Sequence, residues 1–251
     1  MADEEVLFDE RGRVLLITLN RPQARNALTG EMIRLVNEGV AKLDASDHLS
    51  VGVLTGAGGT FCAGMDLKAF AAEGTPPGLR TFLREGARKP MIAAVEGYCV
   101  AGGLEYALSC DLMVAAENVK LGVPEAKRGL LAGGGALVKL PVRVPYAAAM
   151  ELALTGDLIT VQRAYGLGLI ARVTPKGEAV AAALELAAKI AANAPLSVAA
   201  AKQIIKGGVG MSEAERWALQ DSLKDAVFAS NDAKEGPQAF MEKREPNWTG
   251  T

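Results

Sequence analysis

Two glutamates stand where a carboxylate could take part in acid–base chemistry. Glu105 lies inside the apolar stretch 104–108, where a carboxylate is rarely found without a partner or a purpose. It follows Gly102 by three residues, close to one helical turn, so its side chain can face the same space as the Gly102 N–H. Glu125 follows Pro124, and a helix start would explain that pair completely, since both residue types favour the first helical positions.

Small residues near Glu105 would expose backbone N–H groups. Gly64 and Met65 follow a predicted strand and loop, and Gly102 opens a predicted helix, whose first N–H groups lack partners. Two N–H groups that converge on one oxygen form an oxyanion hole, in which each donor is worth about 3–4 kcal/mol. Taken singly, each stretch is better explained by tight turns and close helix–sheet packing. The position of Glu105 favours the oxyanion hole.

Other catalytic chemistries have little support in the sequence. The one histidine, His48, sits in a polar stretch typical of a surface loop, which disfavours Ser-His or Cys-His nucleophiles and histidine-rich metal sites. Cys62, Cys99 and Cys110 are odd in number and lack metal-ligand spacing, so we expect reduced thiols that serve packing. The stretch 56–61 begins like a dinucleotide fingerprint but ends in phenylalanine. The sequence therefore predicts no metal site and no nucleotide cofactor.

The composition limits the class of protein. The chain has 251 residues, of which half are apolar and about a fifth charged, as in a globular protein with a substantial core. A net charge of −2 gives no basic excess for a nucleic acid partner. No run approaches the ~18 apolar residues of a membrane span, and the N-terminal stretch 1–5 is acidic, unlike a signal peptide. We therefore expect a soluble, cytoplasmic protein.

Compact apolar runs alternate with helical periodicity through the first two thirds of the chain. Between residues 31 and 43, apolar side chains recur three and four apart, which predicts a helix with Thr29 as its N-cap. Such alternation predicts an α/β fold. The predicted strands are 14–19, 51–55, 91–95, 112–115 and 170–173, and the further predicted helices are 101–110 and 136–155.

The last third of the chain is predicted to be helical. Residues 177–193 are alanine-rich and end before a proline, and a second helix over 197–206 ends at two glycines. Ser212 and Glu215 have the Ser-x-x-Glu spacing of a capping box, which predicts another helix start. One or two short helices are predicted over 231–244.

The change from alternating strands and helices to helices alone divides the chain into two predicted regions. We expect a core over 1–194 that holds the active site, and a C-terminal helical region over 195–251. So small a helical region needs a neighbour to bury its apolar side chains, which predicts a homo-oligomer.

Seven motifs, in order, resemble the enoyl-CoA hydratase/isomerase (crotonase) superfamily over essentially the whole chain. Each motif is weak alone, and their common order makes chance an improbable explanation. The matching stretches are 20–28, 55–67, 89–98, 101–111, Pro124-Glu125, 133–135 and 233–244.

The resemblance implies a fold and a set of site residues. The fold would be a spiral of ββα units followed by a helical trimerisation region, assembled as a trimer or a dimer of trimers. The backbone N–H groups of Met65 and Gly102 would bind the thioester oxygen, and Glu105 and Glu125 would be catalytic. No cofactor is implied, because coenzyme A is part of the acyl-CoA substrate. The implied substrate-binding residues are Ala24, Arg25, Ala27, Ala63, Gly64, Asp66, Leu67, Gly133, Phe240 and Lys243.

The resemblance also implies a reaction, reversible syn addition of water to a trans-2-enoyl-CoA in fatty acid or related acyl-CoA degradation. A 2-enoyl thioester accepts water at its β-carbon only if the developing enolate oxyanion is stabilised, and two carboxylates can hold one water between them. We assign Glu105 to activating the water and Glu125 to protonating the α-carbon. The family alternatives are a carnitinyl-CoA dehydratase-like reaction and double-bond isomerisation. A third reading is a CoA-binding protein without turnover.

Several residues depart from the common family pattern and leave the acyl group open. Met65 is bulkier than the usual alanine, although its donor is the backbone N–H. Lys127 and Arg128 place two cations just after Glu125, and the stretch 68–88 is short. These departures would change the shape and cover of the acyl pocket.

Overall fold

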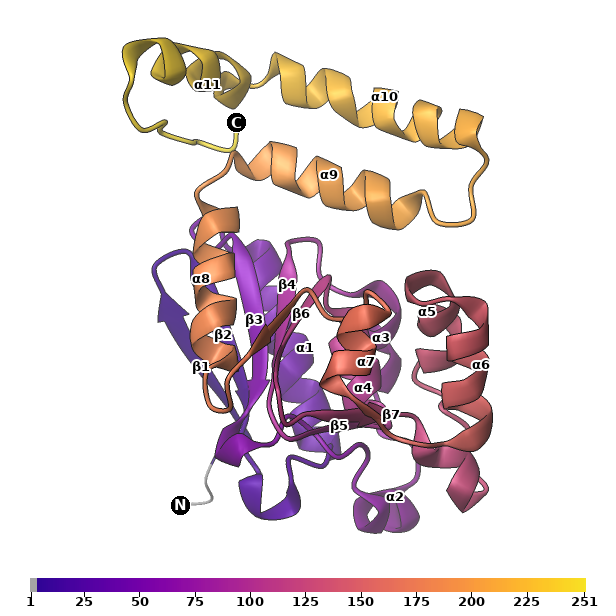
Figure 1. Ribbon diagram of the computed structural model, residues 1–251. Helices are drawn as coiled ribbons and strands as arrows, with labels where there is room; N and C mark the ends of the chain where they lie inside the picture. Colours follow the sequence, from indigo (N-terminus) through magenta and orange to yellow (C-terminus); the bar gives the residue numbers. More distant parts are fainter. Residues whose placement is uncertain (1–3) are drawn as a thin grey trace.

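A twisted sheet forms the centre of the chain in the computed structural model, which describes residues 4–251 (Figure 1). Residues 1–3, part of the acidic N-terminal stretch, lie outside the described residues. The six strands of this sheet are β1 (Val6–Arg11), β2 (Val14–Leu19), β3 (Val51–Gly56), β4 (Met91–Val95), β6 (Leu112–Ala116) and β9 (Arg172–Thr174). They lie in the order β1-β2-β3-β4-β6-β9, and all neighbours except β1 and β2 are parallel.

Helices cover both faces of the sheet. Because its central strands are therefore buried on both sides, their sequences are almost continuously apolar. On one face, α8 (Ala179–Ala191) packs Ala183 and Ala187 against alternate residues of the strands. On the other face lie α1 (Gly30–Ala45) and α4 (Gly102–Ser109). The Thr29 hydroxyl accepts from the Met32 N–H, which confirms the predicted N-cap of α1.

A second, three-stranded sheet consists of β5 (Tyr98–Val100), β7 (Lys120–Gly122) and β8 (Ile159–Thr160). Because α4 follows β5 directly, this sheet fixes where that helix begins. The connecting helices are α2 (Leu67–Glu73), α3 (Leu79–Glu85), α5 (Ala136–Arg143), α6 (Tyr146–Thr155) and α7 (Val161–Gly166). Short 3-10 helices occur at η1 (Pro22–Ala24), η2 (Ala57–Gly59) and η3 (Pro124–Arg128).

Three helices extend beyond the sheet and its covering helices. They are α9 (Pro195–Gly207), α10 (Glu213–Ala229) and α11 (Asn231–Glu242), of which α9 and α10 pack side by side (Figure 1). The Ser212 hydroxyl accepts from the Glu215 N–H, and the Glu215 carboxylate accepts from the Ser212 N–H, which confirms the predicted capping box.

The predicted α/β class and most predicted elements are confirmed, with two boundary errors. The single helix over 136–155 is wrong, because Pro145 holds Val144 in extended backbone and separates α5 from α6. The strand predicted over 170–173 is β9, which begins two residues later. The stretch 231–244 forms one helix, α11, with Pro237 inside it.

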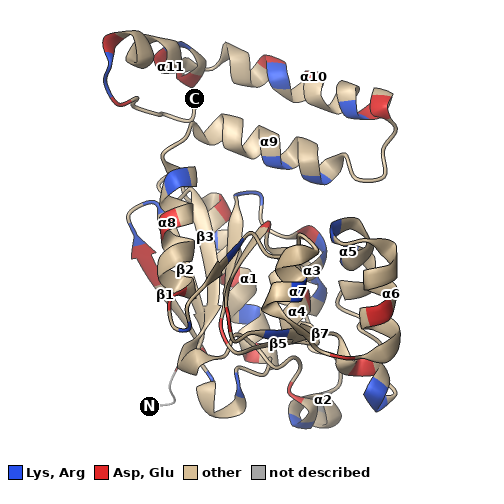
Figure 2. Cartoon of the chain, viewed as in Figure 1, with Lys and Arg blue, Asp and Glu red and all other residues tan. Residues whose placement is uncertain are grey.

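Charged residues of both signs are distributed over many elements of the chain (Figure 2). Lys and Arg are interspersed with Asp and Glu along the chain rather than gathered on one element (Figure 2). Within residues 4–251, no single helix is long and apolar enough to cross a membrane, although α8 and α9, bent by 109° to each other, pass that test together.

Candidate active site

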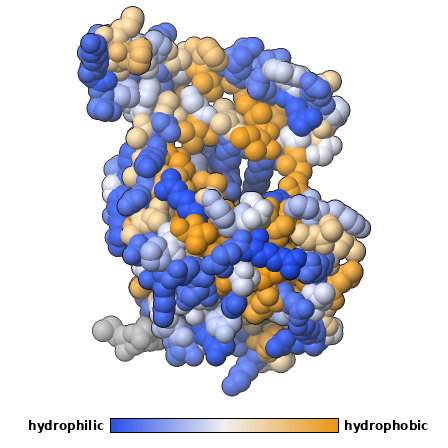
Figure 3. Space-filling view, viewed as in Figure 1, coloured by the Kyte–Doolittle hydropathy of each residue, from blue (hydrophilic) through white to orange (hydrophobic). Residues whose placement is uncertain are grey.

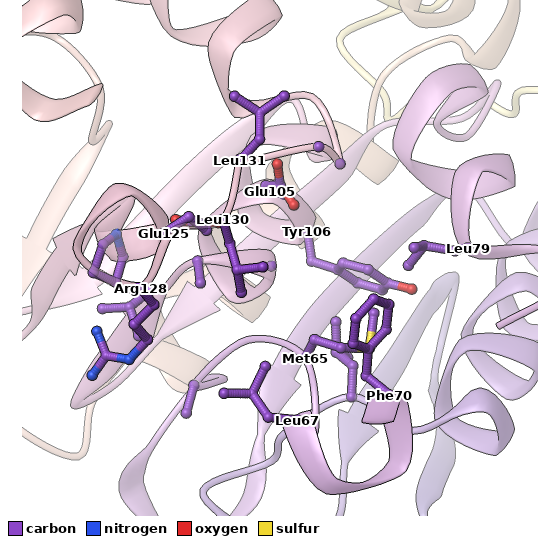
Figure 4. Close-up of a pocket in the computed structure, with 18 of the residues that line it drawn as sticks. Met65, Leu67, Phe70, Leu79, Glu105, Tyr106, Glu125, Arg128, Leu130 and Leu131 are labelled. Atoms are coloured by element: carbon purple, nitrogen blue, oxygen red, sulfur yellow. The ribbon is translucent and has the colours of Figure 1, made fainter. Parts of the chain in front are cut away.

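A cavity of about 700 Å³ opens where the start of α4 meets α2, α3 and η3 (Figure 4). Both predicted catalytic glutamates, Glu105 and Glu125, line it, together with Met65 and Gly102. Its size lies within the range of small-molecule sites, and it combines apolar walls with a few polar groups.

Two backbone N–H groups stand side by side at this cavity. The Met65 nitrogen lies 3.5 Å from the position a Cβ would take on Gly102. Within residues 4–251, neither the Met65 N–H nor the Gly102 N–H donates a hydrogen bond. Gly102 is the first residue of α4, so its N–H has no acceptor in the helix and points out from the positive end. Together these donors have the arrangement of an oxyanion hole.

The backbone around this pair is tightly constrained. Gly64 has φ +100°, and a Cβ there would lie 2.8 Å from the Ala101 Cβ and 3.3 Å from the Gly102 nitrogen. Ala101 itself has φ +51°, in the left-handed region that costs an L-residue energy. The strained Ala101 peptide aims the Gly102 N–H, and glycine at position 64 lets the two loops approach.

Glu105 is held by the start of α5. Its side chain is buried, and the Ala136 N–H donates to Oε1 at 3.2 Å. A Cβ on Gly134 would lie 2.1 Å from Glu105 Oε2, so a glycine is required there. Burial raises the pKa of Glu105 above the usual carboxyl value, and the N–H groups of Ala136, Gly134 and Gly135 offset part of that rise. The start of α5 therefore stabilises the negative charge of Glu105 within an apolar site.

Glu125 differs from Glu105 in having fewer hydrogen-bond donors around its carboxyl group. It lies in the first turn of η3, and its buried Oε2 has no hydrogen-bond partner within residues 4–251. Burial raises the pKa of Glu125, its own backbone N–H lowers it in part, and the charge of Glu105 raises it further. Glu125 therefore lacks most of the N–H donors that stabilise the negative charge of Glu105.

Polar contacts fix the loop that carries Met65. The buried Asn26 side chain donates to the carbonyls of Ala57 at 2.9 Å and Thr60 at 2.6 Å. The Arg21 guanidinium pairs with Asp66 at 3.1 Å, and Asp66 also caps α2 by accepting from the N–H of Lys68. These contacts hold the loop before any ligand arrives.

The structure separates the predicted substrate-binding residues into three groups. Those that line the cavity are Arg25, Ala63, Leu67 and Gly133. Four others do not line the cavity but are next in sequence to residues that do: Ala24, Ala27, Gly64 and Asp66. Phe240, which is 85% exposed, and Lys243 lie at the end of α11, in a different part of the chain from the cavity (Figure 1).

Sequence reasoning missed several residues of the site. Gly134 supports Glu105, but only its place in the run 133–135 hinted at a role. Tyr106 belongs to the apolar stretch 104–108, which predicts a packing role, yet it lines the cavity. The apolar wall comes from α2 and α3, which the sequence did not resolve into elements, and includes Phe70, Leu79 and Leu83.

The cysteines and the histidine lie as expected. Cys62, Cys99 and Cys110 are free and buried, and burial raises the pKa of Cys62 to about 12, which leaves it an inert packing thiol. His48 is exposed in the loop before β3.

Comparison with known proteins agrees with this geometry. The family model for enoyl-CoA hydratase/isomerase matches residues 9–251. An enoyl-CoA hydratase of Mycobacterium tuberculosis is 45% identical, over 97% of this chain and 96% of the relative. A carnitinyl-CoA dehydratase of Proteus mirabilis is 40% identical, over 96% of each chain. A crystal structure of enoyl-CoA hydratase from Mycobacterium tuberculosis superposes with a TM-score of 0.95 at 51% identity, covering 99% of this chain and all of that one. This chain is a member of the enoyl-CoA hydratase/isomerase family.

Proposed function

We propose that the protein is a hydro-lyase that adds water reversibly to a trans-2-enoyl-CoA. The observation that carries this proposal is the meeting of two free N–H groups, at Met65 and Gly102, with two carboxyls, Glu105 and Glu125, in one cavity. The first pair suits a thioester oxygen, and the second pair suits a water molecule.

The N–H pair would act on the thioester carbonyl. As water attacks the β-carbon, negative charge moves to the thioester oxygen and forms an enolate. The N–H groups of Met65 and Gly102 stabilise that charge without reorganisation, because the backbone around them is already fixed. The positive end of α4 adds to the effect.

The carboxyls would divide the proton transfers. Glu105, stabilised as a carboxylate by N–H groups of α5, takes a proton from the attacking water. Glu125, which has few donors to stabilise its charge, gives a proton to the α-carbon. In dehydration the roles reverse. The difference between the two environments supports this assignment.

The test is loss of the conjugated enoyl-thioester absorbance in the wild type, in Glu105→Gln and in Glu125→Gln. We expect turnover in the wild type and a fall of roughly 10²–10⁴-fold in kcat for each variant. Robust turnover in both variants would refute the proposal.

Other reactions of the family predict different substrate preferences. An isomerase would convert a 3-enoyl-CoA far faster than the 2-enoyl-CoA, although one base suffices for that reaction and this site has two carboxyls. A carnitinyl-CoA dehydratase-like enzyme would prefer a 3-hydroxyacyl-CoA with a cationic end. Tight acyl-CoA binding with no turnover of any enoyl thioester would point to a binding protein.

Coenzyme A would lie along the cationic rim of the cavity. Arg25, Lys127 and Arg128 line this rim and are exposed, as an anionic diphosphate requires. The Arg25 guanidinium stacks over the Tyr98 ring at 5.5 Å, which restrains it. Phe240 and Lys243 would reach the CoA of a neighbouring subunit.

A homo-oligomer, either a trimer or a dimer of trimers, would use the C-terminal helices. Helices α9 and α10 contain no buried residue in the described chain, yet they carry large apolar side chains. Apolar surface of this kind is visible on the upper helices in Figure 3. The exposed apolar side chains of α9 to α11 include Ile205, Trp217, Phe228, Phe240 and Met241. We assign the enzyme to the cytoplasm, whose reducing conditions suit its three free cysteines.

A further inference from the structure

The apolar part of the cavity contains one buried polar group that the proposed reaction does not use. It is the phenol of Tyr106, which is fully buried and whose Oη has no hydrogen-bond partner within residues 4–251. Apart from Glu105 and Glu125, every other charged or hydroxyl-bearing side chain that lines the cavity is exposed. These exposed side chains are Arg25, Thr75, Arg80, Tyr98, Lys127 and Arg128.

The phenol lies away from the reacting groups. Tyr106 follows Glu105 on α4, and successive helical side chains diverge by about 100°. In Figure 4 its ring runs away from Glu105 and Glu125, and its hydroxyl points to the side of the cavity where Leu79 lies. Phe70, Leu79 and Met65 form the apolar wall of the same cavity. A group at this position would meet the acyl chain rather than the thioester.

The ring is fixed in this orientation. Tyr106 packs edge-on against Phe82 of α3, with ring centroids 5.5 Å apart and an interplanar angle of 60°. Burial raises the pKa of Tyr106, so the phenol stays neutral and can both donate and accept a hydrogen bond. The Phe70 side chain on α2 lies beside the Tyr106 ring in Figure 4 and is partly exposed, so it is free to change rotamer when an acyl chain enters.

A phenol at this position carries an energetic cost without a ligand. Burying a hydroxyl with no partner is unfavourable, and phenylalanine would fill the same space without that cost. A site built to bond a substrate hydroxyl rejects analogues that lack it, because its own polar group is then left unpaired.

We propose that Tyr106 is a specificity-determining residue that hydrogen-bonds an oxygen function, a hydroxyl or a carbonyl, on the acyl chain beyond the reacting double bond. This inference rests on the proposed hydratase function and names its substrate class: an enoyl-CoA whose chain carries a further oxygen.

The test compares matched substrates in the wild type and in Tyr106→Phe. The probes are trans-2-octenoyl-CoA and its derivatives hydroxylated at the fifth, sixth, seventh or eighth carbon. We expect the wild type to prefer at least one hydroxylated probe. In Tyr106→Phe, the ratio of kcat/KM for that probe to kcat/KM for the unsubstituted probe should fall roughly fivefold to tenfold, the effect of one lost hydrogen bond. Tyr165→Phe, an exposed phenol on α7 outside the cavity, is the matched control and should leave the ratio unchanged.

Binding measurements separate a failure of this inference from a failure of the hydratase proposal. Calorimetry with octanoyl-CoA and the corresponding hydroxyoctanoyl-CoAs gives the same preference ratio without any turnover. A ratio that Tyr106→Phe lowers supports the inference even if no enoyl thioester is hydrated. A ratio that Tyr106→Phe leaves unchanged for every probe overturns it. A lower melting temperature of the ligand-free variant in that case would identify a purely structural role for the hydroxyl.

Discussion

Two residues of the same chemistry lie in different surroundings, and this difference is the basis for the different tasks that we propose for them. Glu105 accepts from the N–H of Ala136 at the start of a helix, whereas the buried Oε2 of Glu125 has no partner within residues 4–251. Burial raises the pKa of both carboxyls, and the charge of Glu105 raises that of Glu125 further. The difference in hydrogen-bond donors supports the proposed assignment of Glu105 as the base and Glu125 as the acid.

Because the burial of Glu125 is unfavourable, replacing it with a residue that cannot ionise should stabilise the protein. Because its pKa is raised on folding, the folded protein keeps a proton that the unfolded chain has released, and stability falls as pH rises from the unfolded pKa through the folded one. Glutamine cannot ionise. Glu125→Gln should therefore melt at a higher temperature than the wild type near pH 7, and the gain should vanish near pH 4, about the pKa of an unfolded glutamate.

Calorimetric melting at several pH values checks this prediction. Glu185→Gln, on the exposed side of α8, is the control and should show no such pH-dependent gain. A Glu125→Gln variant less stable than the wild type near pH 7 would contradict the account of its environment.

At the scale of elements, the site depends on where α4 and α5 begin. The start of α4 supplies the Gly102 N–H, and the start of α5 supplies the N–H groups around Glu105. Glycine is needed at Gly64, where a Cβ would lie 2.8 Å from the Ala101 Cβ, and at Gly134, where a Cβ would lie 2.1 Å from Glu105 Oε2.

The approach of the two loops at Gly64 predicts a loss of catalysis. In Gly64→Ala the new Cβ would meet the Ala101 Cβ at 2.8 Å and displace the adjoining N–H donors. We expect kcat to fall roughly 10²–10³-fold, as when one oxyanion donor is removed. Gly59→Ala is the control, since Gly59 also has positive φ but would place its Cβ in open space. If kcat fell equally in the two variants, backbone strain alone would explain the lower kcat of Gly64→Ala, and the proposed displacement of the N–H donors would be wrong.

The short distance between Gly134 and the Glu105 carboxylate predicts a second variant with a lower kcat. A methyl group at Gly134 would overlap Glu105 Oε2 and turn the carboxylate away from the water, so Gly134→Ala should lower kcat by roughly 10²-fold or more. The adjacent Gly133→Ala variant, whose Cβ would have its nearest neighbour at 3.8 Å, should alter KM more than kcat. Steady-state kinetics on both variants tests this, and a fully active Gly134→Ala would contradict it.

Periodicity predicted the long elements, and it could not predict contacts between them. The apolar spacing over 31–43 and the capping box at Ser212 are local signals, and both are confirmed. Strands of two or three residues, such as β8, are too short to show a period. The support of Glu105 by Gly134 joins residues far apart in the chain, so no local pattern could reveal it. Only the family motif predicts a catalytic role for Glu125, because its own sequence surroundings predict a helix start.

At the scale of the whole molecule, the C-terminal helices present apolar side chains that the described chain does not cover. Ile205 is 77% exposed and Phe228 is 74% exposed, which is costly for an isolated subunit. Burial against other copies would remove this surface from water and would bring Phe240 and Lys243 to a neighbouring site.

From this exposed apolar surface we predict a trimer or a dimer of trimers, which a charge placed on the surface should dissociate. Sedimentation should give three or six times the subunit mass of 26.1 kDa, and Phe228→Glu should shift the protein toward the single subunit by placing a charge in the interface. Asp225→Asn, also exposed on α10, is the control and should leave the mass unchanged. A wild-type protein that sediments as a single subunit would contradict the proposed assembly.

The central claim is that Glu105 and Glu125 act as one unit on one water molecule. The most direct measurement is kcat for trans-2-hexenoyl-CoA hydration by the wild type, Glu105→Gln, Glu125→Gln and the double variant. The account predicts a loss of roughly 10²–10⁴-fold in each single variant, and a double variant no slower than the slower single one, because residues that act together lose their effect together. A single variant that keeps wild-type turnover, or a double variant whose loss equals the product of the two single losses, would contradict it.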